Sequence, residues 1–158
     1  MMDYLDCLNK DSTGLLALLH KRVLTQPDQR AITYMGNVET ELGWLSYQDL
    51  ERQAQVIADL IESQGAEDQR ALLMYSREQG LEFIASFYGC LYAGVTAIPA
   101  SPPQPSQSIS LLQAIVSDAQ ATVVLTTTSV LANLEFWLAQ APELAELRWL
   151  ATDNLASD

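Results

Sequence analysis

Basic residues are scarce in this sequence. It contains 8 Lys and Arg against 20 Asp and Glu, which gives a formal net charge of -12 at pH 7. So large an excess of negative charge repels phosphate backbones and anionic lipid, so nucleic acids and membrane surfaces are not expected partners. The only lysines, Lys10 and Lys21, both precede the first predicted strand.

Long apolar runs are also missing. No stretch approaches the roughly 18 consecutive apolar residues of a membrane-spanning helix, and the opening MMDYLDCLNK is too polar and acidic for a secretory signal. We therefore expect a cytoplasmic protein without a membrane span. A chain of 158 residues, 49% hydrophobic, is enough for one compact domain over residues 1–158, with residues 1–12 flexible.

Histidine and cysteine are nearly absent. His20 is the only histidine and follows the polar side of a helical pattern, so we predict it on the exposed surface. A zinc site or a catalytic triad could be built only around this one residue. Cys7 and Cys90 are far apart and outside any CxxC spacing. Because Cys90 lies in an apolar run, we predict a small buried core residue there.

The usual motifs for phosphate binding and acid–base chemistry are missing as well. Neither GxGxxG nor GxxxxGK occurs, so a nucleotide phosphate has no obvious seat. Asp118, Glu135, Glu143 and Glu146 follow solvated helix faces, and no close carboxylate pair is expected at a strand end. From the residues alone we predict no catalytic, cofactor-binding or metal-binding residue, and we assign no substrate-binding residue.

The first third of the chain predicts a helix, a hairpin and a second helix. Apolar residues at helical spacing follow Ser12 and Thr13, two good N-cap types, which predicts a helix over 13–26. Strands over 31–35 and 38–47 would flank a Gly36-Asn37 turn. Ser46 and Asp49 have the form of a capping box for a helix up to Gly65. Its expected buried face is Leu50, Ala54, Ile57, Ala58 and Ile61.

From Arg70 onward, short apolar runs alternate with helical patterns. The predicted strands are 71–76, 95–100, 122–127 and 148–153. The predicted helices are 80–93, 108–121 and 129–140, with a short one restarting at Pro142. Such alternation is typical of an α/β fold with a mostly parallel sheet and helices on both faces, here preceded by the N-terminal helix and β-hairpin.

Hydroxyl groups follow several of the predicted strands. In an open parallel sheet, ligands collect outside the carboxyl ends of the strands. Those ends are Tyr75-Ser76, Ala100-Ser101-Pro102 and residues 126–129, TTTS. Ser and Thr at such positions also cap the helix that follows, which is the commoner role. Both interpretations, a ligand site and helix caps, follow from the residues.

The segment GLEFIASFYGCLYAGVTAIPASPPQP (80–105) resembles the fatty acyl-AMP ligases, the long-chain branch of the adenylate-forming superfamily. LSYQDLERQAQVIADLI (45–61) is similar to an early element of that family, and the likeness runs from about residue 13 to residue 153. Residues 75–80 depart from it, because they are longer and more charged than the family's short proline-containing turn. The positions that match the family's pattern are Gly89, Cys90, Leu91, Tyr92, Ala93, Gly94, Pro99, Pro102 and Pro103.

The resemblance implies the N-terminal part of an adenylate-forming fold. An intact parent of this family would use ATP and magnesium to convert a fatty acid to acyl-AMP, then pass the acyl group to an acyl carrier protein in lipid or polyketide synthesis. The family's ATP loop and catalytic lysine would come after Asp158. We therefore expect this fragment to hold no cofactor, to be inactive alone, and to act with the remainder of a ligase or multidomain synthase.

Other readings follow from the same residues. A non-catalytic module that binds a carrier protein or a fatty tail is the alternative, whereas a phosphorylatable receiver is excluded because the strand ends LLMYS, AIPAS and LTTTS lack an acidic cluster. Phe83, Phe87, Tyr88 and Tyr92 could border an acyl tunnel, although the helical spacing favours core packing. An uncovered sheet edge would favour a homodimer.

Overall fold

The structure is a computed structural model, and it describes residues 14–65, 69–105 and 107–155. The chain divides into two compact units, Met1–Arg52 and Gln53–Asp158, with the boundary inside helix α2. Cys7, Lys10, the predicted caps Ser12 and Thr13, and the predicted flexible segment 1–12 lie outside the described residues. A single domain over 1–158 stays a prediction.

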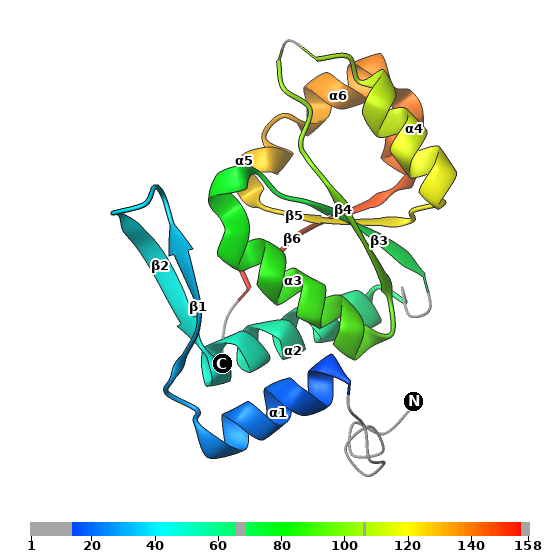
Figure 1. Ribbon diagram of the computed structural model, residues 1–158. Helices are drawn as coiled ribbons and strands as arrows, with labels where there is room; N and C mark the ends of the chain where they lie inside the picture. The colour runs from blue at the N-terminus through cyan, green and yellow to red at the C-terminus, as the bar shows by residue number, and fades with distance from the viewer. Residues whose placement is uncertain (1–13, 66–68, 106, 156–158) are drawn as a thin grey trace. The chain divides into compact units, whose positions relative to one another are not determined.

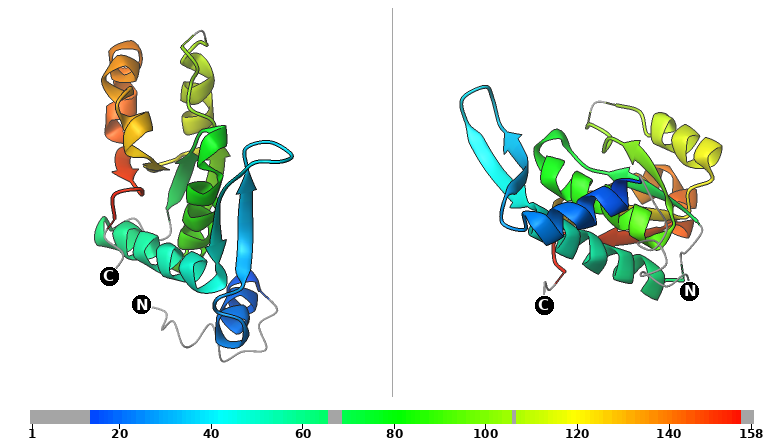
Figure 2. Two further views of the ribbon diagram at one scale, coloured as in Figure 1. Left: turned by 90° about the vertical axis from the view of Figure 1, so that its left-hand side faces the viewer. Right: turned by 60° about the horizontal axis from the view of Figure 1, so that its bottom comes forward.

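The first unit contains helix α1 (Leu15–Thr25) and an antiparallel hairpin of β1 (Arg30–Met35) and β2 (Glu41–Ser46). Helix α1 begins after Gly14, which makes no side-chain cap. Figure 2 shows the hairpin as a two-stranded ribbon with a loop at its tip. Because strands β1 and β2 pair only with each other among the described residues, each leaves its other edge unpaired.

The predicted two-residue turn at Gly36-Asn37 is wrong. The carboxamide oxygen of Asn37 accepts hydrogen bonds from the backbone N–H groups of Glu39 and Thr40, both at 2.9 Å. The N–H of Gly36 donates to the carbonyl of Thr40 at 2.8 Å. Asn37 therefore folds a longer loop upon itself, and β2 begins at Glu41 rather than at residue 38.

Helix α2 (Tyr47–Ser63) starts at the predicted capping box. The Asp49 N–H donates to the Ser46 hydroxyl oxygen at 3.0 Å, and the Ser46 N–H donates to the Asp49 carboxylate at 3.3 Å. These bonds satisfy backbone donors that a helix start leaves free, so Tyr47 opens the helix instead of ending the strand. The predicted apolar face is confirmed, because its members are all buried: Leu50, Ala54, Ile57, Ala58 and Ile61.

The second unit is built on a four-stranded parallel sheet (Figure 1). Its strands are β3 (Arg70–Met74), β4 (Thr96–Ala100), β5 (Val123–Thr126) and β6 (Arg148–Ala151), in the order β4-β3-β5-β6. The chain runs from β3 to β4 on one side, then back across to β5 and β6 on the other. Pro99 fits its place in β4 because an edge strand tolerates a missing N–H donor.

Helices cover both faces of this sheet, which confirms the predicted fold class. Helix α3 (Gly80–Ala93) lies on one side, and helices α4 (Ser110–Ala119) and α6 (Leu134–Gln140) lie on the other (Figure 1). Two 3₁₀ turns, η1 (Arg77–Gln79) and η2 (Pro142–Glu146), precede α3 and β6. Among the described residues, no helix combines the length and the apolar character needed to cross a membrane.

The continuous helix predicted over 129–140 is wrong. The structure has a short α5 (Thr128–Leu131), then Ala132 and Asn133, and then α6. The N–H of Asn133 donates to the carbonyl of Val130 at 3.1 Å, a tighter i to i-3 bond than an α-helix makes. Asn is a weak helix former because its side chain competes for backbone hydrogen bonds. The break at Asn133 was not predicted because the apolar residues before and after it keep a helical spacing.

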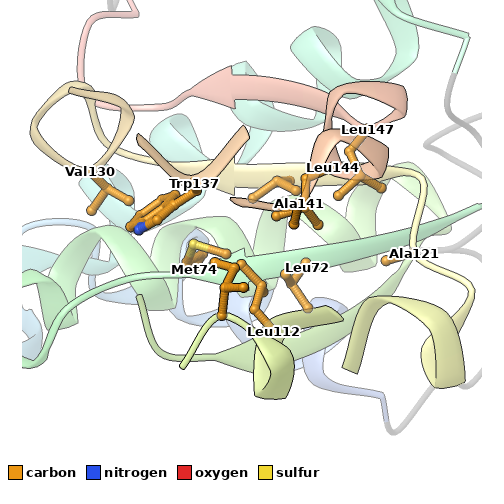
Figure 3. Packing of buried hydrophobic residues seen from close by; sticks show 11 residues of the cluster. Leu72, Met74, Leu112, Ala121, Val130, Trp137, Ala141, Leu144 and Leu147 are labelled. Carbon is orange, nitrogen blue, oxygen red and sulfur yellow. The ribbon is translucent and has the colours of Figure 1, made fainter. Parts of the chain in front are cut away.

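A hydrophobic cluster fills the space between the sheet and the α4 and α6 side (Figure 3). Leu72 and Met74 of β3 are fully buried there, and Trp137 of α6 packs near them at 4% exposure. The ring of Trp137 lies 6.2 Å from that of Trp149, whose indole N–H donates to the carbonyl of Leu144 at 2.9 Å. Buried strands of this kind need cover on both faces.

Two glycines of the GCLYAG run have different physical roles. A Cβ added to Gly89 would lie 2.7 Å from the Cγ2 of Ile57 and 3.1 Å from the carbonyl oxygen of Ala54, so α3 and α2 approach closely there. Gly94 ends α3 with φ +70°, where a side chain would be strained. Close helix packing and a left-handed helix end thus account for the first and last residues of this run.

Candidate functional site

The candidate site lies at the carboxyl ends of β3, β5 and β6. From β3 the chain adds β4 on one side, and it then returns to add β5 and β6 on the other side of β3. The point between β3 and β5 where the strand order reverses is a topological switch point, which is where ligands bind in open α/β folds. Side chains from the strand ends, from η1 and from α3 form hydrogen bonds here, and we call them the strand-end network. Its members are Tyr75, Gln79, Ser86, Thr126, Thr127, Thr128, Ser129, Thr152 and Asp153.

Tyr75 is the centre of one half of this network. Its hydroxyl oxygen lies 2.6 Å from the Ser86 hydroxyl and 2.7 Å from the Thr152 hydroxyl. The single proton of Thr152 goes to the carbonyl of Thr126, 3.1 Å away. Tyr75 must therefore donate to Thr152, which leaves Ser86 to donate to Tyr75.

The chemistry of Tyr75 follows from its burial. Loss of solvent around the ring raises the pKa of Tyr75 to about 12, although the hydrogen bonds with Ser86 and Thr152 oppose this shift. The ring also meets Phe83 edge to face at 6.3 Å. A phenol held neutral in this way orders its neighbours and cannot serve as a base near neutral pH.

Gln79 bridges the β3 end to the β5 end. Its amide nitrogen donates to the Thr127 hydroxyl at 2.7 Å and to the Ser129 hydroxyl at 3.1 Å. Its amide oxygen accepts the Ser76 N–H at 2.8 Å. The Ser76–Gln79 turn, which departs from the family pattern, therefore spans the switch point.

Asp153 closes the network beyond β6. Its carboxylate accepts the N–H of Thr128 at 2.9 Å and the Thr128 hydroxyl at 2.7 Å. Behind it, the Thr126 hydroxyl donates to the carbonyl of Met74 at 2.5 Å. The ends of three strands are thus joined through side chains as well as through the sheet.

The network's own donors and acceptors satisfy one another. Within the described residues, no buried side-chain nitrogen or oxygen lacks a partner, so none of the buried side-chain polar atoms is left free for a ligand. Thr127 also caps α5, where its hydroxyl accepts the N–H of Val130 at a long 3.5 Å. The helix-cap interpretation of the strand-end hydroxyls is favoured over a ligand site by these bonds.

ATP and magnesium do not fit this set of donors. In the described ranges, no three His, Cys, Asp or Glu side chains come together to hold a metal, and the network contains one carboxylate and no cation. A nucleotide triphosphate with its metal needs positive charge and free N–H groups. The strand-end network therefore orders the sheet edge, and we derive no reaction step from it.

The sequence pattern predicts part of this network, namely the hydroxyl groups at the ends of β3 and β5. The ends of β3 and β5 are brought together as predicted, whereas Ser101 at the end of β4 makes no hydrogen bond to the network among the described residues. For Thr152 and Asp153, the sequence pattern predicts only a strand and no place in the network. Their partners could not be read from the sequence because the order of strands places β6 beside β5, and spacing along the chain does not reveal that order.

Predictions for isolated residues fared differently. Cys90 is fully buried, and burial raises the pKa of its thiol to about 12, which confirms a structural core residue. His20 is not the exposed residue predicted, because its side chain is 25% exposed and its Nδ1 lies 2.9 Å from the Glu51 carboxylate. The helical pattern alone could not show that α2 brings Glu51 to it. The four predicted solvated acids, Asp118, Glu135, Glu143 and Glu146, are exposed.

The four aromatic residues of α3 are half-buried, so their assignment to the core is wrong. The residues of α3 that reach the core are small: Ala85, Ser86, Gly89, Cys90 and Ala93. Close approach of α2 at Gly89 leaves no space for rings on that face. Phe87 and Tyr88 instead meet each other edge to face at 5.7 Å.

Comparison with known proteins places this fold and sequence in one family. The sequence model of the AMP-binding enzyme family matches residues 19–155 of this chain. The chain is 40% identical over 145 residues to the medium-chain fatty acid–acyl-carrier-protein ligase JamA of Moorena producens, covering 89% of this chain and 24% of JamA. It is 32% identical to the putative fatty-acid–CoA ligase FadD21 of Mycobacterium tuberculosis, covering 75% of this chain and 21% of that protein.

Solved structures agree. A fatty acyl-adenylate ligase of Legionella pneumophila, solved with acyl adenylate and pyrophosphate, superposes with a TM-score of 0.78 at 26% identity. The match covers 92% of this chain and 24% of that one, so the chain spans about a quarter of the length of these relatives. The chain belongs to the AMP-binding enzyme family, and the relatives it matches there are fatty-acid ligases.

Proposed function

We propose that this chain is a scaffold portion of a fatty acyl-AMP ligase. The complete enzyme would join a fatty acid to the α-phosphate of ATP, releasing pyrophosphate, and would then transfer the acyl group from AMP to the thiol of an acyl carrier protein. ATP and magnesium would be its cofactors, and lipid or polyketide synthesis in the cytoplasm would be its setting. The observation that carries this proposal is the 40% identity to JamA over 89% of the chain.

The chain alone is proposed to be inactive. Stabilising a pentavalent phosphate needs cations, and the strand-end network contains one carboxylate and no cation. What the network supplies is order, since it fixes the ends of β3, β5 and β6 against one another. A rigid sheet edge of this kind supports residues contributed by other parts of a larger protein.

A chimera tests this scaffold role. The 145 matched residues of JamA would be replaced by the corresponding residues of this chain, and fatty-acid-dependent exchange between ATP and pyrophosphate would be measured. We expect the chimera to retain exchange. A second chimera carrying Leu125→Ala, which empties a fully buried position of the sheet, is the matched control and should lose much of it. A folded first chimera without exchange would contradict the proposal.

We also propose that the outer edge of β6 pairs with a second copy when nothing else covers it. Among the described strands, β6 has a partner on one side only, and Trp149, Leu150 and Ala151 along it are half-buried. The opposite edge, β4, carries Pro99, which discourages pairing. Sedimentation should show a concentration-dependent dimer that Leu150→Pro weakens. A monomer at all concentrations would rule this out.

A further inference from the structure

Helix α1 presents a face that combines exposed leucines with cations. Leu15, Lys21 and Arg22 stand at helical neighbour spacings from Leu18, so the four side chains share one side of the helix. Leu15 is 50% exposed and Leu18 is 52% exposed, while Lys21 and Arg22 are both exposed. We call these four residues the α1 cationic face. Leu19, one turn after Leu15 and at the margin of this face, is buried at 4% exposure.

The two cations of this face make no ion pair with another described residue. Helix α1 contains no acidic residue, and within residues 14–65, 69–105 and 107–155 no carboxylate lies at ion-pair distance from Lys21 or Arg22. Other arginines of the same unit are already paired: Arg30 with Glu41 at 2.9 Å and Arg52 with Asp49 at 2.7 Å. In a chain of net charge -12, this is a local positive surface with an apolar centre.

We propose that the α1 cationic face docks an acidic helical surface of an acyl carrier protein. The inference rests on the proposed function, which supplies such a partner. Leu15 and Leu18 would form the apolar centre of the contact, with Lys21 and Arg22 at its rim. Arrangements of this kind set orientation and association rate, since opposite charges steer the encounter and apolar contact holds it.

Charge argues against an anionic membrane and against a second copy of the chain as the partner of the α1 cationic face. Each Lys or Arg near an anionic membrane contributes about 1 kcal/mol, so two cations give too little to hold a chain whose remaining charge is repelled. A second copy of the chain docked symmetrically through the same face would place Lys21 and Arg22 against the same cations of its partner. An acidic partner that contacts only the α1 cationic face gains attraction while staying clear of the acidic surface elsewhere.

The test uses the 158-residue chain and a bacterial acyl carrier protein in its apo form, which has no thiol arm. Titration calorimetry would compare the wild-type chain with Arg22→Glu, Leu18→Ser and the conservative Arg22→Lys. We expect Arg22→Glu to weaken binding by about tenfold or more, because reversal places like charges together. Leu18→Ser should also weaken binding, and Arg22→Lys should restore it. Raising the salt concentration should reduce the difference.

Arg148→Glu is the matched control. Arg148 is exposed at the start of β6 in the other unit, and its reversal changes the net charge by the same amount. We expect Arg148→Glu to alter affinity by about twofold or less, because Arg148 is not part of the α1 cationic face and its exposed charge is screened by salt. Absence of saturable binding by the wild-type chain, or equal losses for Arg22→Glu and Arg148→Glu, would overturn the proposal.

Two further measurements identify a different occupant. Binding to anionic phosphatidylglycerol vesicles without binding to the carrier protein would assign the face to a membrane and refute the docking proposal. Self-association that Arg22→Glu abolishes would assign it to a second copy, with the same consequence. Because the titration contains neither ATP nor a reactive thiol, its failure leaves the ligase proposal standing. Failure of the chimera would likewise leave a measured docking intact.

Discussion

The two units of this chain solve the problem of burying apolar surface differently. In the second unit, residues 53–158, which we call the sheet unit, the strands are nearly continuous apolar runs covered on both faces. Leu72, Val124 and Leu125 are fully buried there. The first unit, residues 1–52, which we call the hairpin unit, has one helix face and one two-stranded ribbon to bury. Of the nine large hydrophobic side chains exposed among the described residues, seven lie there: Leu15, Leu18, Leu24, Met35, Val38, Leu42 and Trp44.

This difference indicates where stability and where contact reside. A parallel sheet needs cover on both sides and provides its own core, whereas a two-stranded ribbon is marginal by itself and relies on neighbours. Exposed apolar residues gathered in one region are typical of surfaces that meet another protein. We therefore assign most of the folding energy to the sheet unit and most of the recognition surface to the hairpin unit.

The largest expected effect comes from the same truncation made in each unit. Leu125→Ala removes a fully buried side chain from β5 and should lower the free energy of unfolding by about 2 to 5 kcal/mol. Leu42→Ala, at a side chain 59% exposed in β2, should change it by less than about 0.5 kcal/mol. Urea unfolding monitored by tryptophan fluorescence measures both. Equal losses would show that the two units share stability evenly.

High pH should weaken the sheet unit through two buried groups. In the folded chain, the pKa of Tyr75 is raised from 10.0 to about 12 and that of Cys90 from 9.0 to about 12, both chiefly by burial. A raised folded pKa means that the unfolded chain loses the proton first. The stability present below pH 9 is therefore lost as pH rises toward 12, by about 3 kcal/mol for Tyr75 alone.

Tyr75→Phe isolates the tyrosine in this experiment. The variant should start less stable at neutral pH, because Ser86 loses a partner while buried, and should then show a shallower decline above pH 10. Cys90→Ala tests the thiol in the same way. Unfolding free energies measured at intervals between pH 8 and 11 give the slopes. An unchanged slope in Tyr75→Phe would contradict the burial argument.

Close packing of α2 against α3 predicts a smaller effect. Gly89→Ala would place a Cβ 2.7 Å from Ile57, so the helices must shift, at a cost of about 1 to 3 kcal/mol. In a double-mutant cycle, Ile57→Ala should reduce the cost of Gly89→Ala, since it removes Cγ2, the nearest of the clashing atoms. The comparison in the hairpin unit is Gly14→Ala, where nothing lies within 4 Å. Thermal unfolding that ranks Gly14→Ala as the more damaging change would contradict this assignment.

The smallest expected effect is a gain. Gln120 ends α4 with φ +54°, a conformation in which a side chain is strained, so Gln120→Gly should stabilise the chain by about 0.5 to 1 kcal/mol. Gln140→Gly is the matched control, because Gln140 is exposed in the last turn of α6 with helical geometry. That variant should be neutral or destabilising. A loss of stability in Gln120→Gly would contradict the prediction.

The same contrast between units explains what could be predicted from the sequence. Helix 80–93 was predicted at the residues where α3 begins and ends, because Gly94 is a strong stop and the apolar run is long. The capping box at Ser46 and Asp49 and the alternation of strands and helices were equally local signals. Where local chemistry decides the structure, the sequence suffices.

Features that depend on a distant partner were missed. Glu51 reaches His20 only because α2 folds back on α1. Likewise Thr152 joins Tyr75 across the sheet at a separation of 77 residues. In each case the tertiary arrangement, and not the residue type, determines the contact.

The most direct test of the account is the activity of the 158-residue chain itself. Purified chain, shown to be folded by near-ultraviolet circular dichroism, would be given ATP, magnesium and medium- or long-chain fatty acids, with JamA assayed beside it. We predict fatty-acid-dependent pyrophosphate exchange by JamA and none by the chain, because the strand-end network has no cation and the described residues contain no cluster that could hold a metal. Robust exchange by the chain alone would contradict the scaffold assignment.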